Sequence, residues 1–537
     1  MNRRTWIGPL GVRASLALSL ALLGGCQTSP EPQVQSQPNM VLFVVDDMGW
    51  QDTSVPLHEE PTVWNSLYHT PNMERLAATG MRFTQAYAAS PVCSPTRVSI
   101  LTGKNPARTR ITDWVGHGMY GNRYVRAPQW ETDGLQPGHE QTLPEVLNGM
   151  GYRTIHIGKG HFGGDGTPGA DPGTLGFDVA IGGGRAGSPD GSYFLPFDSV
   201  QYPGLGEYPH GTHINDALTQ EANGQIDRAV AEGVPFFLNM AHYAVHTPII
   251  DQGDPSYLER YGDRPDPEDD YAALLESMDA SLGSVLDNLE RHGISENTLI
   301  VFVSDNGGLS NHTRNATDSY TLPGGGSVRF ERDRHNSPLK GGKGSAYEGG
   351  VRVPMIVSWA RQSPEEAATP DLRIAPGSVS DHAVVTHDIF PTLLSAAGFE
   401  GAGSSIAELD GVDLTPLLIG EENAHADRAI YFHYPHQWYR DIGVGVGIQP
   451  FTSMRKGAWK LIYFYGDGDA DGQGFDPVFE LYDLHQDVGE TVDLSDARPD
   501  VVGAMAREMS DWMIEVGAQT PINVTTDRPV PLPSSGR

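Results

Sequence analysis

Cysteine is nearly absent from this chain: its 537 residues include two, Cys26 and Cys93. Small exported proteins without a large core are held together by several disulfides, and two cysteines cannot supply such a framework. The length instead allows a large domain and a smaller one around a substantial core. Stability must therefore come from packing and, we expect, from a bound metal ion.

Positive charge is also scarce. The chain has 36 Lys and Arg against 68 Asp and Glu, a formal net charge of −32. Nucleic-acid binding requires a basic surface, so this balance argues against a nucleic-acid partner. Strong acidity favours solubility, and an anionic substrate would require a local pocket of cations.

Long hydrophobic runs are missing as well. The apolar stretch over residues 14–23 is too short to span a bilayer, and it follows three arginines. This pattern predicts an export signal over residues 1–26, in which Leu23-Gly24-Gly25-Cys26 resembles a bacterial lipobox. Residues 27–38 are rich in Gln, Pro and Ser and predict a flexible tether. We expect an exported protein anchored by lipid on Cys26 to a bacterial membrane, in the periplasm or at the outer membrane and cell surface; a plain secretory signal is the alternative.

Two predicted strands end in side chains that carry oxygen. Residues 40–45 and 299–304 are continuous apolar runs, typical of strands buried on both faces of a mostly parallel sheet. Asp46-Asp47 follows the first run and Asp305-Asn306 the second. Ligands bind at the carboxyl ends of such strands, and this set of oxygens suits Ca²⁺ or Mg²⁺. Asp46-Asp47 taken alone would fit a turn equally well.

Cys93 stands in Cys93-Ser94-Pro95-Thr96-Arg97. Pro95 suits the first position of a helix, which places Cys93 at or just before a helix N-terminus, where anions are favoured. Arg97 follows about one turn later and can reach back over the same spot. A lone cysteine is often only a small buried apolar residue, so the pentapeptide by itself leaves its role open.

Together with Leu101-Thr102-Gly103-Lys104, this pentapeptide resembles the activation motif of the type I, formylglycine-dependent sulfatases of the alkaline phosphatase superfamily, bacterial polysaccharide sulfatases among them. The resemblance runs from about Met40 to Trp512 and includes the Thr70-Pro71-Asn72 segment. It implies that a formylglycine-generating enzyme oxidises Cys93 to Cα-formylglycine, whose hydrate is the nucleophile. It also implies a metal ion, calcium in preference to magnesium, held by Asp46, Asp47, Asp305 and Asn306.

Further segments of the resemblance supply cations. Gly158-Lys159-Gly160-His161 stands where the family commonly has Gly-Lys-Trp-His, and we expect Gly160 to widen this side of the pocket. His246-Thr247-Pro248 resembles the segment of the catalytic histidine, whereas His242 is expected either to support residues of the site from behind or to be structural. Within residues 338–354, Lys343 matches the sulfate-binding lysine, with Lys340 as the alternative. Catalytic roles are thus implied for Cys93, Arg97, Lys159, His161, His246 and Lys343.

The implied fold class is α/β, with a large mixed, mostly parallel sheet sandwiched by helices over residues 39–425, as in alkaline phosphatase. Residues 426–537 predict a smaller α+β subdomain with an antiparallel sheet, from alternating stretches at 459–463 and 479–484. Apolar spacing predicts a core-facing helix over 269–292. Contacts with substrate are expected from His433, His436, Trp114 and His117.

The implied function is hydrolysis of sulfate monoesters, R–O–SO₃⁻ to R–OH and sulfate, on a sulfated polysaccharide or oligosaccharide. One alternative is a phosphomonoester or phosphonate hydrolase of the same superfamily. The other is an inactive glycan-binding lipoprotein, which would result if Cys93 were never modified.

Overall fold

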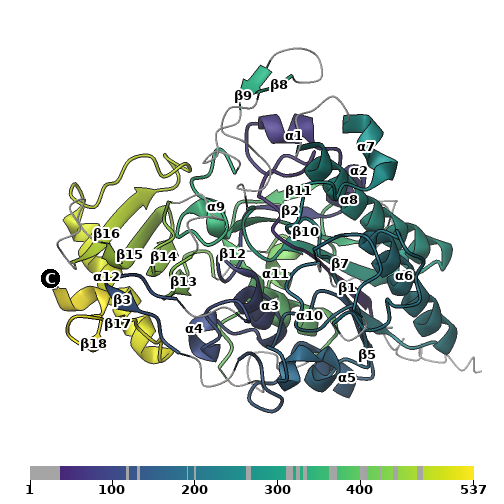
Figure 1. The fold of residues 1–537 in the computed structure, drawn as a ribbon, viewed down its shortest axis with the longest axis horizontal. Helices are drawn as coiled ribbons and strands as arrows, with labels where there is room; N and C mark the ends of the chain where they lie inside the picture. The colour runs from purple at the N-terminus through teal and green to yellow at the C-terminus, as the bar shows by residue number, and fades with distance from the viewer. Residues whose placement is uncertain are drawn as a thin grey trace, which may run out of the picture. The chain divides into compact units, whose positions relative to one another are not determined.

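The computed structural model describes residues 37–116, 120–129, 133–189, 191–198, 201–261, 268–309, 319–321, 327–329, 336–361, 372–399, 406, 408–421, 425–438, 446–467 and 476–536 (Figure 1). The predicted export signal, Cys26 and all but the last two residues of the tether lie outside these ranges, as does His117. None of the helices in the described ranges combines the length and the apolar composition needed to cross a bilayer.

A nine-stranded sheet organises the larger part of the described chain. In spatial order its strands are β11 (Ser378–Ser380), β2 (Met81–Tyr87), β10 (Arg352–Trp359), β7 (Thr298–Ser304), β1 (Asn39–Val45), β6 (Phe236–Ala241), β4 (Arg153–Gly158) and β5 (Val179–Ile181), and β12 (Val384–Val385) pairs with β2. The run from β7 to β5 is parallel, whereas β10 is antiparallel to both of its neighbours. The predicted mixed, mostly parallel sheet is confirmed.

Side chains of β1 point alternately to two separate cores. One set packs with helices α2 (Pro71–Thr79), α6 (Ile214–Glu232) and α8 (Glu268–Arg291). The other set packs with α3 (Cys93–Thr102), α5 (Leu143–Gly149) and α10 (Ile389–Ala396). A strand that is buried on both faces must be apolar throughout, which explains the continuous apolar run at residues 40–45. The predicted sandwich of helices around the sheet is confirmed (Figure 1).

A second sheet, which is antiparallel, follows later in the chain. It consists of β13 (Ile430–Tyr434), β14 (Phe451–Lys456), β15 (Trp459–Asp467) and β16 (Asp476–Asp483), and helix α12 (Pro499–Glu515) packs on it. This confirms the predicted smaller α+β part, while the boundary at residue 426 stays a prediction.

The remaining elements are short. The strands β3 (Val125–Arg126), β17 (Ile522–Asn523) and β18 (Arg528–Pro529) form a small sheet, and β8 (Ser319–Thr321) pairs with β9 (Ser327–Arg329). The short α-helices are α1 (Val63–Leu67), α4 (Pro106–Thr109), α7 (Pro255–Tyr261), α9 (Glu348–Val351) and α11 (Thr415–Leu418).

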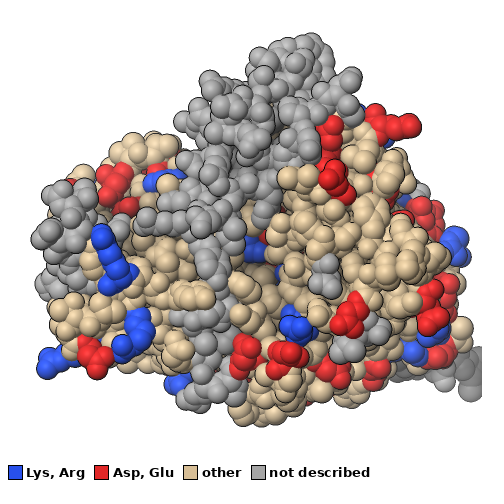
Figure 2. Space-filling view, in the orientation of Figure 1, with Lys and Arg blue, Asp and Glu red and all other residues tan. Residues whose placement is uncertain are grey.

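The acidic charge of the protein is visible on its surface. Figure 2 shows one face of the protein, in the orientation of Figure 1, and acidic side chains are spread over the side of it where α6 and α8 lie. Such a surface repels anions at a distance. An anion site on this protein therefore needs local cations that offset the acidic surface.

Candidate active site

The ends of β1 and β7 bring the four predicted metal ligands together. The two strands are neighbours and parallel, so their carboxyl ends lie at the same edge of the sheet. The Asp47 amide N–H donates to Asp305 Oδ1 at 3.2 Å, and Asn306 Nδ2 donates to Asp47 Oδ1 at 2.8 Å. These residues and Asp46 are buried.

Each buried carboxylate in this group forms a close ion pair with a Lys or Arg, and Asp46 Oδ1 also lies 3.8 Å from the Arg97 guanidinium. Arg97 reaches the group from α3, Lys159 follows β4, and Lys343 lies in the loop before α9. The pairs are Lys159 Nζ with Asp46 Oδ2 at 2.7 Å, Lys343 Nζ with Asp47 Oδ1 at 2.5 Å, and Arg97 Nε with Asp305 Oδ2 at 2.7 Å.

The ion pair of Asp47 fixes its charge. Burial alone would raise the pKa of Asp47, but Lys343 and His246 outweigh burial and hold that pKa well below its usual range. Asp47 is therefore ionised, and it can serve as a ligand for a cation.

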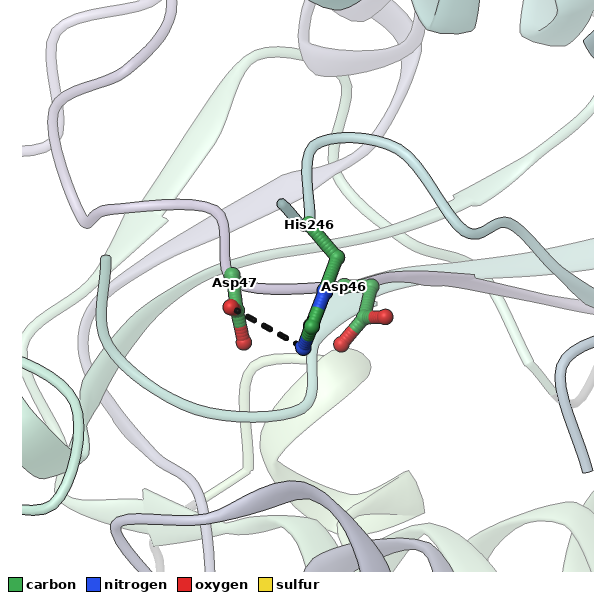
Figure 3. A group of neighbouring side chains, drawn as sticks. All are labelled: Asp46, Asp47 and His246. Atoms are coloured by element: carbon green, nitrogen blue, oxygen red, sulfur yellow. Dashed lines mark ion pairs between the residues drawn. The ribbon is translucent and has the colours of Figure 1, made fainter. Parts of the chain in front are cut away.

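Several oxygens of this group fit a hard cation. Asp46 Oδ1, Asp47 Oδ2 and Asn306 Oδ1 are buried and accept no hydrogen bond from any described residue. Buried polar atoms normally have partners, so acceptors of this kind suit a metal such as Ca²⁺ or Mg²⁺. Ligand atoms of Asp46, Asp47 and His246 also lie within 4.8 Å of one another. Figure 3 shows the imidazole between the two carboxylates; His246 Nε2 lies 3.7 Å from Asp47 Oδ2, a contact that is an ion pair when the ring is protonated.

The orientation of His246 follows from its other nitrogen. Nδ1 lies 2.8 Å from the carbonyl oxygen of Thr247. A carbonyl can only accept, so Nδ1 carries the hydrogen in the neutral ring and the Nε2 lone pair faces Asp47. Burial lowers the pKa of His246 well below its usual value, and Asp47 only partly offsets this.

Cys93 is the first residue of helix α3, which begins two residues earlier than Pro95 predicted. The residue is 3% exposed, and its Sγ lies 3.3 Å from Nδ1 of His161. Burial raises the pKa of the Cys93 thiol. A plain thiol here is therefore a weak nucleophile, despite its position at a helix N-terminus.

One cavity of about 530 Å³ reaches four of the predicted catalytic residues, whereas Arg97, Lys159 and the four predicted metal ligands do not line it. Its lining includes Cys93, His161, His246 and Lys343. Its walls also contain aromatic and polar residues that the sequence did not single out, chiefly Tyr202, Trp438 and Arg185. The glycine-rich run at residues 182–187, directly after β5, was the available signal for this wall, since ligand sites form at strand ends.

Comparison with known proteins agrees with this geometry. The profile of the Sulfatase family matches residues 38–399, and the profile of the N-sulphoglucosamine sulphohydrolase C-terminal region matches residues 342–516. The chain belongs to the sulfatase family. Sulfatases hydrolyse sulfate esters and generally use a metal ion and a formylglycine residue.

Three similar proteins illustrate the relationship. N-acetylgalactosamine-6-sulfatase of Canis lupus familiaris is 34% identical over 448 residues, which are 79% of this chain and 72% of the relative. A sulfatase of Formosa agariphila is 28% identical over 577 residues, 95% of each protein. The crystal structure of Ps i-CgsB in complex with k-i-k-neocarrahexaose has a TM-score of 0.64 and 27% identity, and the match covers 89% of this chain and 93% of that one.

The residues expected to contact substrate divide into two groups in this sulfatase. Trp114 lines the cavity. His433 and His436 do not: both are fully buried, His433 between Thr452 Oγ1 (2.7 Å) and the carbonyl of Gln519 (3.1 Å), and His436 against Thr112 Oγ1 (2.8 Å). The structure thus corrects our assignment of both histidines to substrate, because neighbouring protein groups hold their rings in the interior.

The expected widening of the pocket at Gly160 is wrong. A Cβ built on Gly160 would lie 3.0 Å from the carbonyl oxygen of Gly184 and 3.1 Å from its nitrogen. The backbone at Gly184 therefore fills the space that a side chain at residue 160 would need. His242, by contrast, is buried between Asn215 and Ser281 and does not line the cavity.

Proposed function

We propose that this sulfatase acts on sulfate monoesters of a polysaccharide or oligosaccharide. The observation that carries the proposal is the single cavity lined by Cys93, His161, His246 and Lys343, with Trp114 and Trp438 in its wall. Aromatic rings in a pocket suit the apolar face of a sugar ring. The names of two similar proteins support the same class: one is an N-acetylgalactosamine-6-sulfatase, and the other was crystallised with a neocarrahexaose.

We assign the nucleophile to residue 93, after its conversion by a formylglycine-generating enzyme. Formylglycine supplies a hydrated aldehyde, which can attack sulfur with one hydroxyl and then release sulfate by losing the proton of the other. His161 takes up that proton at Nδ1, the nitrogen that faces residue 93 at 3.3 Å. Arg97 orients residue 93 from the next turn of α3.

The remaining catalytic residues act on the sulfate and on the leaving group. Lys159 and Lys343 hold sulfate oxygens, since their ammonium groups already lie at the buried edge of the sheet. Nε2 of His246 is free of the backbone contact that holds Nδ1, so we assign it to the departing sugar oxygen, to which Nε2 of the protonated imidazolium gives its proton.

We propose that Asp46, Asp47, Asp305 and Asn306 bind a divalent metal ion, calcium in preference to magnesium. The donors are all oxygens, and three of those oxygens accept no hydrogen bond from described residues. Bound there, the ion would supply positive charge that favours ionisation of a hydroxyl at residue 93. Arg97, Lys159 and Lys343 would keep the site positive against three carboxylates.

The cellular setting remains a proposal from the sequence. Residues 1–26 would direct export, and lipid on Cys26 would anchor the enzyme to a bacterial membrane. Mass spectrometry of the N-terminal peptide from membrane fractions would test this, with a Cys26→Ala variant as the control. An unlipidated N-terminus in the membrane-free fraction would overturn it.

The catalytic proposal is tested with protein matured by a formylglycine-generating enzyme. We expect turnover of an aryl sulfate and of sulfated saccharides, and much slower turnover of the phosphate ester of the same alcohol. Cys93→Ala should lose turnover but keep the unfolding temperature of the parent. The tryptic peptide with residue 93 should be lighter by about 18 Da than the thiol form. Preferred hydrolysis of phosphate, or unmodified Cys93 with saccharide binding alone, would overturn the proposal.

A further inference from the structure

Arg185 is a cation at the wall of the cavity whose charge the catalytic groups do not use. It lines the same cavity as Cys93 and Lys343. Its side chain is 43% exposed, and among the described residues its ion-pair partner is Asp165 Oδ1 at 3.6 Å, on a side chain that is 82% exposed. Ion pairs this open to water contribute little, so the guanidinium is available to a ligand.

The backbone around Arg185 is fixed against His161. The His161 amide N–H donates to the carbonyl of Gly184 at 2.8 Å. On the other side of Arg185, a Cβ built on Gly187 would lie 2.6 Å from Cε1 of the His161 ring. Gly160 permits this approach, because any larger side chain there would meet Gly184. The segment that contains Arg185 therefore packs directly against His161, which contacts residue 93.

The electrostatic setting at the cavity favours an anion near Arg185. The described residues that line the cavity include no Asp or Glu. The carboxylates of Asp46, Asp47 and Asp305 are each paired with Lys or Arg. Arg185 is thus a local positive charge on a protein with a formal net charge of −32, and it lines the cavity that contains Cys93.

We propose that Arg185 binds a second anionic group of the saccharide, a sulfate or a carboxylate on the same sugar as the scissile sulfate or on the adjoining one. The site then selects multiply charged saccharides over singly sulfated ones. The planar guanidinium can donate two hydrogen bonds to two oxygens of such a group. This inference rests on the proposed function and names the substrate class of the same cavity.

The test compares four substrates: an aryl monosulfate, a monosulfated disaccharide, the same disaccharide with a second sulfate, and the same disaccharide with a carboxylate. The enzymes are the parent, Arg185→Ala, Arg185→Lys and Arg126→Ala. Arg126 is an exposed arginine paired with Asp527 outside the cavity, so it controls for the change in net charge. Comparing the last two saccharides identifies which anionic group Arg185 binds.

We expect Arg185→Ala to lower kcat/KM on the doubly charged saccharides about 10- to 100-fold, mainly through KM, because a hydrogen-bonded charge is lost. The activity of Arg185→Ala on the aryl sulfate and on the monosulfated disaccharide should change less than about 2-fold. Arg185→Lys should recover part of the loss on the doubly charged saccharides. Arg126→Ala should resemble the parent on all four substrates. An equal loss on all four substrates, or no loss on any, would overturn the inference. Failure of the parent enzyme on every sulfate ester would instead overturn the proposed function.

Discussion

Nε2 of His161 lies 3.3 Å from the carbonyl oxygen of Val115, and this contact determines which nitrogen of the neutral ring carries the hydrogen. Because a carbonyl only accepts, Nε2 carries the hydrogen and Nδ1 is left as an acceptor. Burial, together with Lys159, lowers the pKa of His161 well below its usual value. These shifts favour the neutral ring, whose Nδ1 can accept a proton from residue 93.

The first prediction concerns this histidine. His161→Gln should lower kcat on an aryl sulfate by about 100-fold or more, since a positioned acid–base group contributes that much. Steady-state kinetics should be measured on protein with known formylglycine content. His242→Gln is the matched control, because His242 is also fully buried but does not line the cavity; it should lose stability and keep kcat. A His161→Gln enzyme with nearly parental kcat would contradict the assignment.

The second prediction separates the two lysines of residues 338–354. Lys343 Nζ contacts Asp47 and lines the cavity. Lys340 Nζ instead donates to Tyr482 Oη at 3.2 Å and lies 3.8 Å from the centre of the Tyr347 ring. Lys343→Ala should lower kcat/KM about 100-fold or more, as loss of one charge-stabilising donor does.

Lys340→Ala serves as its control. This change should leave kcat/KM within a few-fold and lower the free energy of unfolding by about 1 to 2 kcal/mol, through the lost hydrogen bond and cation–π contact. Steady-state kinetics and denaturant unfolding of both variants show which lysine supports catalysis and which one stabilises the fold. The opposite pattern would exchange the roles of the two lysines.

The edge of the sheet could be predicted from the sequence because its signals are local. An apolar run followed directly by Asp46-Asp47 fixes both the strand and its polar end, and neighbouring parallel strands then bring Asp305 close. The cavity wall could not be predicted in this way. Arg185 and Trp438 lie in loops, and their positions depend on contacts such as that of Gly184 with His161.

The errors in the prediction have the same origin. Histidines between aromatic residues look like a sugar-binding strand, but the same pattern fits a strand whose histidines bond to buried neighbours, as His433 does with Thr452. Gly160 was expected to leave extra room in the pocket, because the sequence does not show that the backbone of Gly184 occupies this space. Local patterns give the strands and their ends, whereas loop packing decides which side chains face the cavity.

The third prediction concerns the metal ion. Removal of the metal ion with a calcium chelator should abolish turnover. The protein should stay folded, because Lys159, Lys343 and Arg97 still pair with the carboxylates. Calcium at 100 times its Kd should raise the free energy of unfolding by about 2.7 kcal/mol, and magnesium less. Metal content and thermal unfolding measure this. Asn306→Ala should weaken the calcium effect, and a chelated enzyme with full activity would contradict the site.

The fourth prediction is a pH dependence of stability that arises from a buried carboxyl group outside the proposed metal ligands. Glu490 is fully buried, with Oε1 3.1 Å from Lys460 Nζ and Oε2 accepting from the Glu348 amide at 2.6 Å. Lys460 also pairs with the Glu348 carboxylate at 3.0 Å. Burial raises the pKa of Glu490 from 4.5 to about 7, and Lys460 only partly opposes this.

The two pKa values of Glu490, in the unfolded and in the folded chain, determine whether stability rises or falls with pH. Between pH 4.5 and about 7 the unfolded chain ionises this carboxyl while the folded protein keeps the proton. The folded state therefore binds more protons, and its stability falls as pH rises through this window. Glu490→Gln mimics the protonated form and should remove this slope, on the order of 1 to 3 kcal/mol between pH 5 and 8. Thermal unfolding of the parent and of Glu490→Gln across this pH range measures the slope. The exposed Glu207→Gln is the control and should keep the slope of the parent. An unchanged slope in Glu490→Gln would mean that another group titrates.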